Sequence, residues 1–100
     1  MVGPMPSSQP GAGHVTLRYW ASARAAAGVE TDVVEVAGPV TLADLVETSL
    51  RLHPESAKLP QVLDCCSVLI GERPANSEDR STITVEPGAH VEFLPPFAGG

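Results

Sequence analysis

Hydrophobic and polar residues alternate in two segments of the chain, residues 14–20 near its beginning and residues 90–94 near its end. A period of two is typical of strands with one buried face. The inward-facing residues are Val15, Leu17 and Tyr19 in the first segment and Val91 and Phe93 in the second. A third segment, Thr31 to Val36, is rich in valine and acidic residues. We predict a strand at each of the three.

The clearest helical pattern lies between residues 42 and 53. Its apolar residues recur at helical spacing and place one apolar stripe on the helix surface; they are Leu42, Leu45, Val46 and Leu50. Thr41 stands at the N-cap position and Asp44 follows three residues later, which resembles a capping box with a shorter acid. Pro54 excludes the helical conformation from the residue before it. We therefore predict a helix from Leu42 to about His53 that packs on a sheet.

Shorter elements are expected elsewhere. The alanine-rich stretch 21–27 ends at Gly28 and fits a short helix, with Ser22 available as its cap. In chain order, the other expected segments are a polar connection with a turn or two of irregular helix at 55–64, a strand at 66–70, a charged loop at 71–80, a short strand at 81–85 and a turn at 86–89.

The order of these elements defines the fold class. Two strands, a helix and then further strands allow a parallel pair between the first strand and a later one, joined by a right-handed crossover. We predict an α+β fold, a small mixed sheet with one main helix packed across it, as in the ubiquitin-like β-grasp; a ferredoxin-like layout is the alternative. Residues 1–13 are expected to form a flexible arm, 14–94 the domain and 95–100 a protruding C-terminal tail.

Composition narrows the function. One hundred residues with 43% hydrophobic content are typical of one globular domain. Six basic against twelve acidic residues give a net charge of −6, which argues against nucleic-acid binding because such binding depends on Lys and Arg. No apolar run approaches the roughly 20 residues that span a bilayer, and residues 1–12 lack the basic and apolar regions of a signal peptide. The sequence predicts a soluble cytoplasmic protein with no membrane partner.

Catalytic and metal-binding patterns do not stand out. Cys65 and Cys66 are neighbours and would close no useful loop as a disulfide, so we expect one to face the core and the other to face away, as alternating strand residues do. The three histidines show no metal-ligand spacing, and no metal site is expected. No phosphate-binding glycine loop or hydrolase motif is present.

The C-terminal segment is the exception. Leu94 leads into Pro95 and Pro96, and the chain ends in Gly99-Gly100. A frayed tail is the simple interpretation, since termini are often rich in glycine. However, a frayed tail does not require prolines that direct it away from the domain.

Residues 93–100, Phe-Leu-Pro-Pro-Phe-Ala-Gly-Gly, resemble the C-terminal signature of the MoaD family, the small subunits of molybdopterin synthase. That family is similar to the thiamine-pathway sulfur carrier ThiS and to ubiquitin. The resemblance covers about residues 15–100. The arm has no counterpart in the family, the loop 71–80 is longer, and the turn 86–89 has a different sequence.

The resemblance implies a sulfur carrier of molybdenum cofactor biosynthesis. An E1-like enzyme would use ATP to adenylate the carboxyl group of Gly100, and a sulfurtransferase would supply the sulfur of a thiocarboxylate. The thiocarboxylate would then donate sulfur to the pterin precursor, which is bound by a MoaE-like large subunit. The chain would be no enzyme on its own and would hold no permanent cofactor.

The remaining tail residues receive roles from the same resemblance. Gly99 and Ala98 would thread the tail past the nucleotide, since small residues let the backbone approach closely. Phe97, with Pro95 and Pro96, would dock on the partner. The alternative for Phe97 is that it folds back on its own domain.

Other functions remain open from the sequence. A ubiquitin-like modifier would use the same adenylate to form isopeptide bonds through Gly100. A sulfur carrier for thiamine or cysteine synthesis would share the thiocarboxylate. An interaction module with an incidental tail is the fourth hypothesis.

Overall fold

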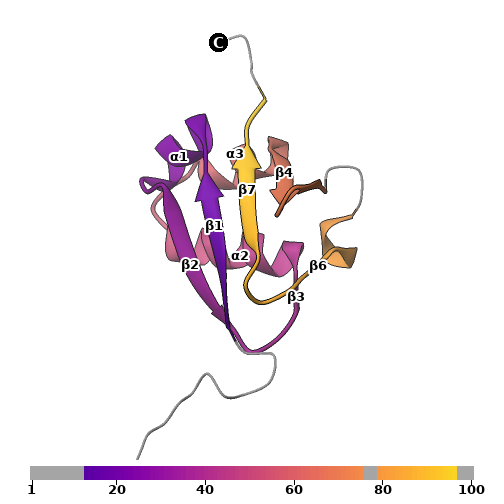
Figure 1. Cartoon of the computed structure of the whole chain (residues 1–100). Helices are drawn as coiled ribbons and strands as arrows, with labels where there is room; N and C mark the ends of the chain where they lie inside the picture. Colours follow the sequence, from indigo (N-terminus) through magenta and orange to yellow (C-terminus); the bar gives the residue numbers. More distant parts are fainter. Residues whose placement is uncertain (1–12, 76–78, 97–100) are drawn as a thin grey trace, which may run out of the picture.

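The molecule is built on a five-stranded mixed sheet (Figure 1). This computed structural model describes residues 13–75 and 79–96. Across the sheet the strand order is β2 (Thr31–Val36), β1 (Gly13–Tyr19), β7 (His90–Leu94), β4 (Ser67–Ile70) and β5 (Arg73–Pro74). Strands β1 and β7 are parallel, and the other neighbours are antiparallel. The predicted parallel pairing between the first strand and a later one is therefore confirmed.

Helices cover one face of this sheet (Figure 1). They are α1 (Ala21–Ala27), α2 (Leu42–Leu52) and α3 (Leu59–Cys65). A second, two-stranded sheet pairs β3 (Val40–Thr41) with β6 (Thr84–Val85). The predicted α+β, ubiquitin-like β-grasp arrangement is confirmed, with α2 as the main helix and two shorter helices beside it.

Helix α2 begins as its sequence predicts. The backbone N–H of Asp44 donates to Oγ1 of Thr41 over 3.0 Å, and the backbone N–H of Thr41 donates to Oδ2 of Asp44 over 3.3 Å. This reciprocal capping box satisfies two of the donors that a helix start leaves without a partner. The helix ends at Leu52, two residues before Pro54.

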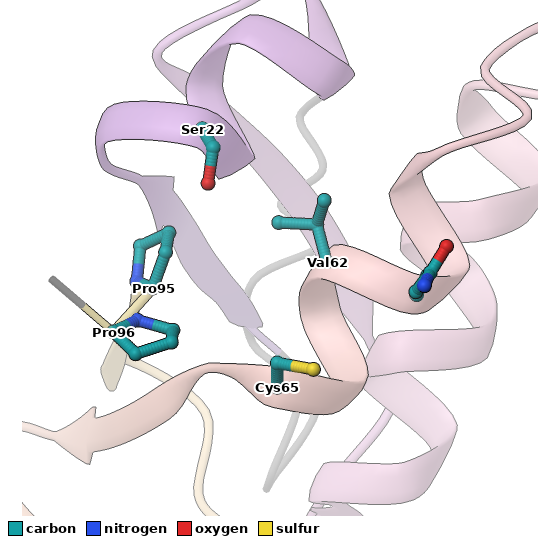
Figure 2. Close-up of a pocket in the computed structure, with 6 residues that line it drawn as sticks. Ser22, Val62, Cys65, Pro95 and Pro96 are labelled. Carbon is teal, nitrogen blue, oxygen red and sulfur yellow. The ribbon is translucent and has the colours of Figure 1, made fainter. Parts of the chain in front are cut away.

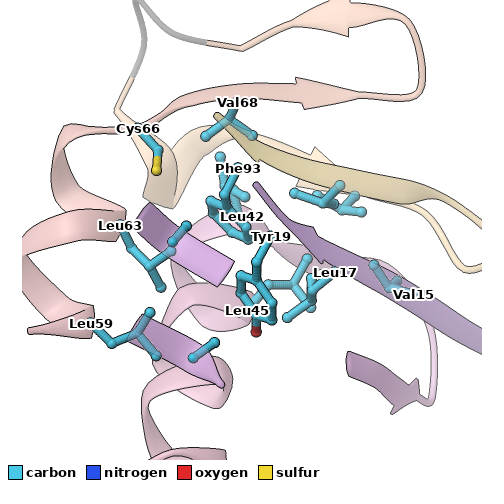
Figure 3. Close-up of a cluster of buried hydrophobic side chains, with 14 residues drawn as sticks. Val15, Leu17, Tyr19, Leu42, Leu45, Leu59, Leu63, Cys66, Val68 and Phe93 are labelled. Atoms are coloured by element: carbon cyan, nitrogen blue, oxygen red, sulfur yellow. The ribbon is translucent and has the colours of Figure 1, made fainter. Parts of the chain in front are cut away.

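The core lies between the sheet and the helices (Figure 3). Every residue predicted to face inward from the two alternating strands is at most 1% exposed. Leu42 and Leu45 of α2 are buried against them. Aliphatic side chains make up most of this core, and Tyr19 and Phe93 are its largest members.

The polar connection expected at 55–64 contains a regular helix, so this part of the prediction was wrong. Leu59 and Leu63, four residues apart, are both fully buried, and Pro60 occupies the first turn, where a missing N–H does no harm. Cys66 ends this helix, so β4 begins at Ser67 and not at Cys66.

Two smaller expectations were also wrong. Residues 80–82 form a 3₁₀ turn because the carboxylate of Asp79 accepts the backbone N–H of Ser81 over 2.9 Å, which leaves only Thr84–Val85 as strand. The cap of α1 is Trp20, whose side chain does not bond the helix, and not Ser22. The chain turns directly from β1 into α1 at Ala21, with a positive φ of 49°.

The described residues bear only partly on the three predicted segments. Gly13 pairs with Val36, so β1 begins one residue before the expected boundary of the domain. Residues 1–12 lie outside the description, and the flexibility of the arm stays a prediction. None of the helices in the described part of the chain has the length and apolar character needed to cross a bilayer.

Candidate functional site

The tail leaves the molecule from the central strand. Strand β7 lies between β1 and β4, and its last residues pair with both: Phe93 with Tyr19 and Leu94 with Ser67. The backbone N–H of Trp20 adds a hydrogen bond of 3.2 Å to the carbonyl oxygen of Phe93. The direction in which the chain leaves the sheet is therefore held by neighbours on both sides.

Of the six predicted tail residues, the structure describes two. Pro95 and Pro96 follow β7 directly at the edge of the domain (Figure 1). The predicted reactive residue Gly100, the threading residues Gly99 and Ala98, and the docking residue Phe97 lie outside the described residues.

A hollow of about 230 Å³ lies at the base of the tail. Figure 2 shows side chains from α1, from α3 and from the start of the tail around it. The wall is mostly apolar, and the hollow opens to solvent. Its lining residues are Ser22, Gln61, Val62, Cys65, Pro95 and Pro96.

The two cysteines face different surroundings, as predicted. Cys65 is exposed in the wall of the hollow, whereas Cys66 is buried and 7% exposed. Burial raises the pKa of the Cys66 thiol to about 11, because the interior disfavours the charged thiolate. The cause of the opposite orientations is the end of α3 rather than strand alternation, since Cys65 ends that helix and Cys66 caps it.

Arg80 holds this helix end in place. Its Nη1 donates to the carbonyl oxygen of Leu63 over 2.9 Å, and its Nη2 donates to that of Cys66 over 3.0 Å. A helix end leaves carbonyl groups without partners, and a guanidinium group can satisfy two of them. Arg80 thereby connects the 3₁₀ turn to the wall of the hollow.

The residues that follow β1 and face outward form a second feature near the tail. The Trp20 ring is 39% exposed, and the guanidinium carbon of Arg18 lies 4.5 Å from its centre. The indole N–H of Trp20 donates to Oε1 of Glu92 over 2.9 Å. These contacts keep a large apolar ring fixed on the surface beside β7.

A buried polar network supports the other end of the same region. The Tyr19 hydroxyl donates to Oδ2 of Asp32 over 2.7 Å, and Nε2 of His53 lies 2.6 Å from the same oxygen. Because Tyr19 gives its only hydrogen to Asp32, the Ser49 hydroxyl, 2.6 Å away, must donate to Tyr19. Burial raises the pKa of the Tyr19 phenol far above its usual value, so this hydrogen stays in place.

This network is structural in its position. It joins α2 to β1 and β2, and the Tyr19 ring stacks on Phe93 with centroids 5.8 Å apart. In the part of the chain that the structure describes, no buried side-chain nitrogen or oxygen lacks a hydrogen-bond partner. Nor do three His, Cys, Asp or Glu side chains gather there closely enough to hold a metal ion.

The hollow was missed at the sequence level because α3 was missed. Leu59, Val62 and Leu63 have the spacing of one helix face, and Pro60 is favoured in a first helical turn. That signal was present but short. That α3 lies beside Pro95 and Pro96 is a matter of tertiary structure.

The sheet, its helices and the tail on the central strand define the β-grasp class of small ubiquitin-like carriers and modifiers. The sequence pattern of the ThiS family matches residues 17–100. The chain belongs to the ThiS family. No curated protein sequence matches it.

Solved structures agree on the fold. SAMP1 of Haloferax volcanii superposes with a TM-score of 0.71 at 24% identity, over 88% of this chain and all of that one. A putative molybdopterin converting factor subunit 1 of Pyrococcus furiosus gives 0.67 at 21% identity, over 84% of this chain and 98% of that one. A complex of subunits 1 and 2 of this factor from Helicobacter pylori gives 0.57 at 20% identity, over 87% and 99%.

Proposed function

We propose that this chain is a sulfur carrier of molybdenum cofactor biosynthesis that acts through the terminal carboxyl group of Gly100. The observation that carries the proposal is the exit of the chain from β7. The central strand is held on both sides up to Leu94, and the tail then starts with two prolines. Membership of the ThiS family and the tail motif support the same chemistry.

The chemistry needs an activating partner. A carboxylate is a poor electrophile, so an E1-like enzyme first joins it to the adenylyl group of ATP and releases pyrophosphate. A sulfurtransferase then supplies sulfur that displaces AMP and leaves a thiocarboxylate. That group donates its sulfur to a pterin precursor held by a MoaE-like large subunit. The chain contributes the reactive terminus and no general acid or base.

The geometry of the tail suits delivery into another protein. The six residues from Pro95 to Gly100 reach roughly 20 Å when extended. The rings of Pro95 and Pro96 fix φ at the start of this reach. The domain can therefore dock outside a pocket while the terminal carboxyl group enters it.

Intact mass spectrometry tests the proposal. The full chain is co-expressed with an E1-like enzyme and a sulfurtransferase, with the Gly100 deletion variant as control. We expect the mass gain of oxygen replaced by sulfur in the full chain and none in the variant. Adducts of the chain on lysines of other proteins, without this mass gain, would instead indicate a modifier.

The same chemistry serves other sulfur-carrier pathways. Adding a large subunit with its pterin precursor should consume the thiocarboxylate and restore the original mass. Consumption only by enzymes of thiamine or cysteine synthesis would assign the chain to those pathways and contradict the proposal.

Two tail variants should separate activation from docking. Gly99→Val should block adenylation, because a β-branched side chain restricts the backbone where the tail passes the nucleotide. Phe97→Ala should chiefly weaken binding to the large subunit, by roughly thirtyfold if Phe97 is an interface anchor. Pyrophosphate release measures the first effect and calorimetry the second. Equal loss of adenylation in both variants, with unchanged binding, would remove Phe97 from the interface.

A further inference from the structure

The hollow at the base of the tail has no role in the sulfur transfer proposed above. It measures about 230 Å³, and its wall is mostly apolar. An engineered apolar cavity of about 150 Å³ binds benzene. The hollow therefore has room for a phenyl ring, and an apolar ring is the chemistry that its wall favours.

We propose that the ring of Phe97 from the same chain occupies this hollow while the protein is free of partners. Pro96 lines the hollow and is the last described residue before the end of the chain. Phe97 is bonded to it directly, so the two Cα atoms are about 3.8 Å apart. Only four residues follow Pro96, and Phe97 is the only large apolar residue among them. No other segment of the chain begins so close to the hollow.

The prolines make this occupancy inexpensive. Their rings fix φ at positions 95 and 96, so the backbone has little freedom left to lose before it reaches Phe97. The apolar contact then has to offset the ordering of essentially one residue, and the two effects are of similar size. The contact is therefore reversible. A partner groove that binds Phe97 must first withdraw it from the hollow.

Cys65 provides a natural reporter of this contact. Its thiol lies in the wall of the hollow, and the ring of Phe97 would cover it. Cys66 does not compete as a target, because it is buried and its thiol has a raised pKa of about 11. The rate at which a bulky maleimide alkylates the full chain therefore measures access to Cys65.

We expect Phe97→Ala to accelerate alkylation of Cys65 by about tenfold if the ring occupies the hollow nine-tenths of the time. Phe97→Leu retains an apolar side chain and should accelerate it much less. The matched control is Asp64→Cys combined with Cys65→Ser, which moves the thiol to an exposed neighbouring position outside the wall. Alkylation of that control should not respond to Phe97→Ala.

A direct measurement completes the test. In the NMR spectrum of the wild-type chain, the ring protons of Phe97 should show nuclear Overhauser contacts to the methyl groups of Val62. Absence of these contacts, equal alkylation of wild type and Phe97→Ala, or the same acceleration in the Asp64→Cys control would each overturn the proposal. Neither measurement requires an activating enzyme, so a failure here leaves the mass test of sulfur loading unaffected.

Discussion

Deletion of Gly100 is expected to abolish sulfur loading and leave the melting temperature unchanged. The reacting atom is the terminal carboxyl carbon, and each residue removed withdraws it by about 3.3 Å from the site of adenylation. The deleted residue follows the last described residue, Pro96, by four positions and is not part of the buried core. Intact mass after co-expression measures loading, and circular dichroism measures the melting temperature.

A chain extended beyond Gly100 by an uncleavable tag serves as the control. It retains every residue of the tail but replaces the free carboxyl group by an amide, so it should also fail to load. Loading of the tagged chain, with the tag shown to be intact, would contradict a reaction at the terminus.

Replacement of Phe93 by alanine should have the opposite signature. Phe93 is fully buried in the central strand and stacks on Tyr19. Large-to-small changes at such positions leave a cavity and cost about 3–5 kcal/mol. For a domain of this size the melting temperature should fall by at least about 12 °C. Thermal unfolding followed by circular dichroism is the measurement.

Phe93→Leu is the matched control, because it leaves a smaller cavity and should lower the melting temperature less. At a temperature where Phe93→Ala is still folded, its Gly100 should load with sulfur. A melting temperature of Phe93→Ala within a few degrees of wild type would show that the packing against Tyr19 contributes little.

Most of the fold could be predicted because its signals are local. Strands β1 and β7 alternate cleanly, and α2 carries its own cap at Thr41 and Asp44. Helix α3 was missed because its seven residues contain only three apolar positions and a proline. Ser22 was assigned as a cap on residue type alone, but the turn at Ala21 places the start of α1 at Trp20.

The tail chemistry was proposed from the sequence alone, because two prolines followed by a terminal Gly-Gly form a contiguous motif whose meaning does not depend on distant residues. The same holds for the buried face of each regular strand, which the period of two sets locally.

Only the tertiary structure decided what surrounds the tail. The hollow brings together residues of α1, α3 and the tail that are separated by about seventy positions in the chain. The network of Tyr19, Asp32 and His53 likewise joins three elements through side chains that the sequence shows as unrelated. Such sites arise from the packing of the helices on the sheet, and residue spacing along the chain carries no signal for them.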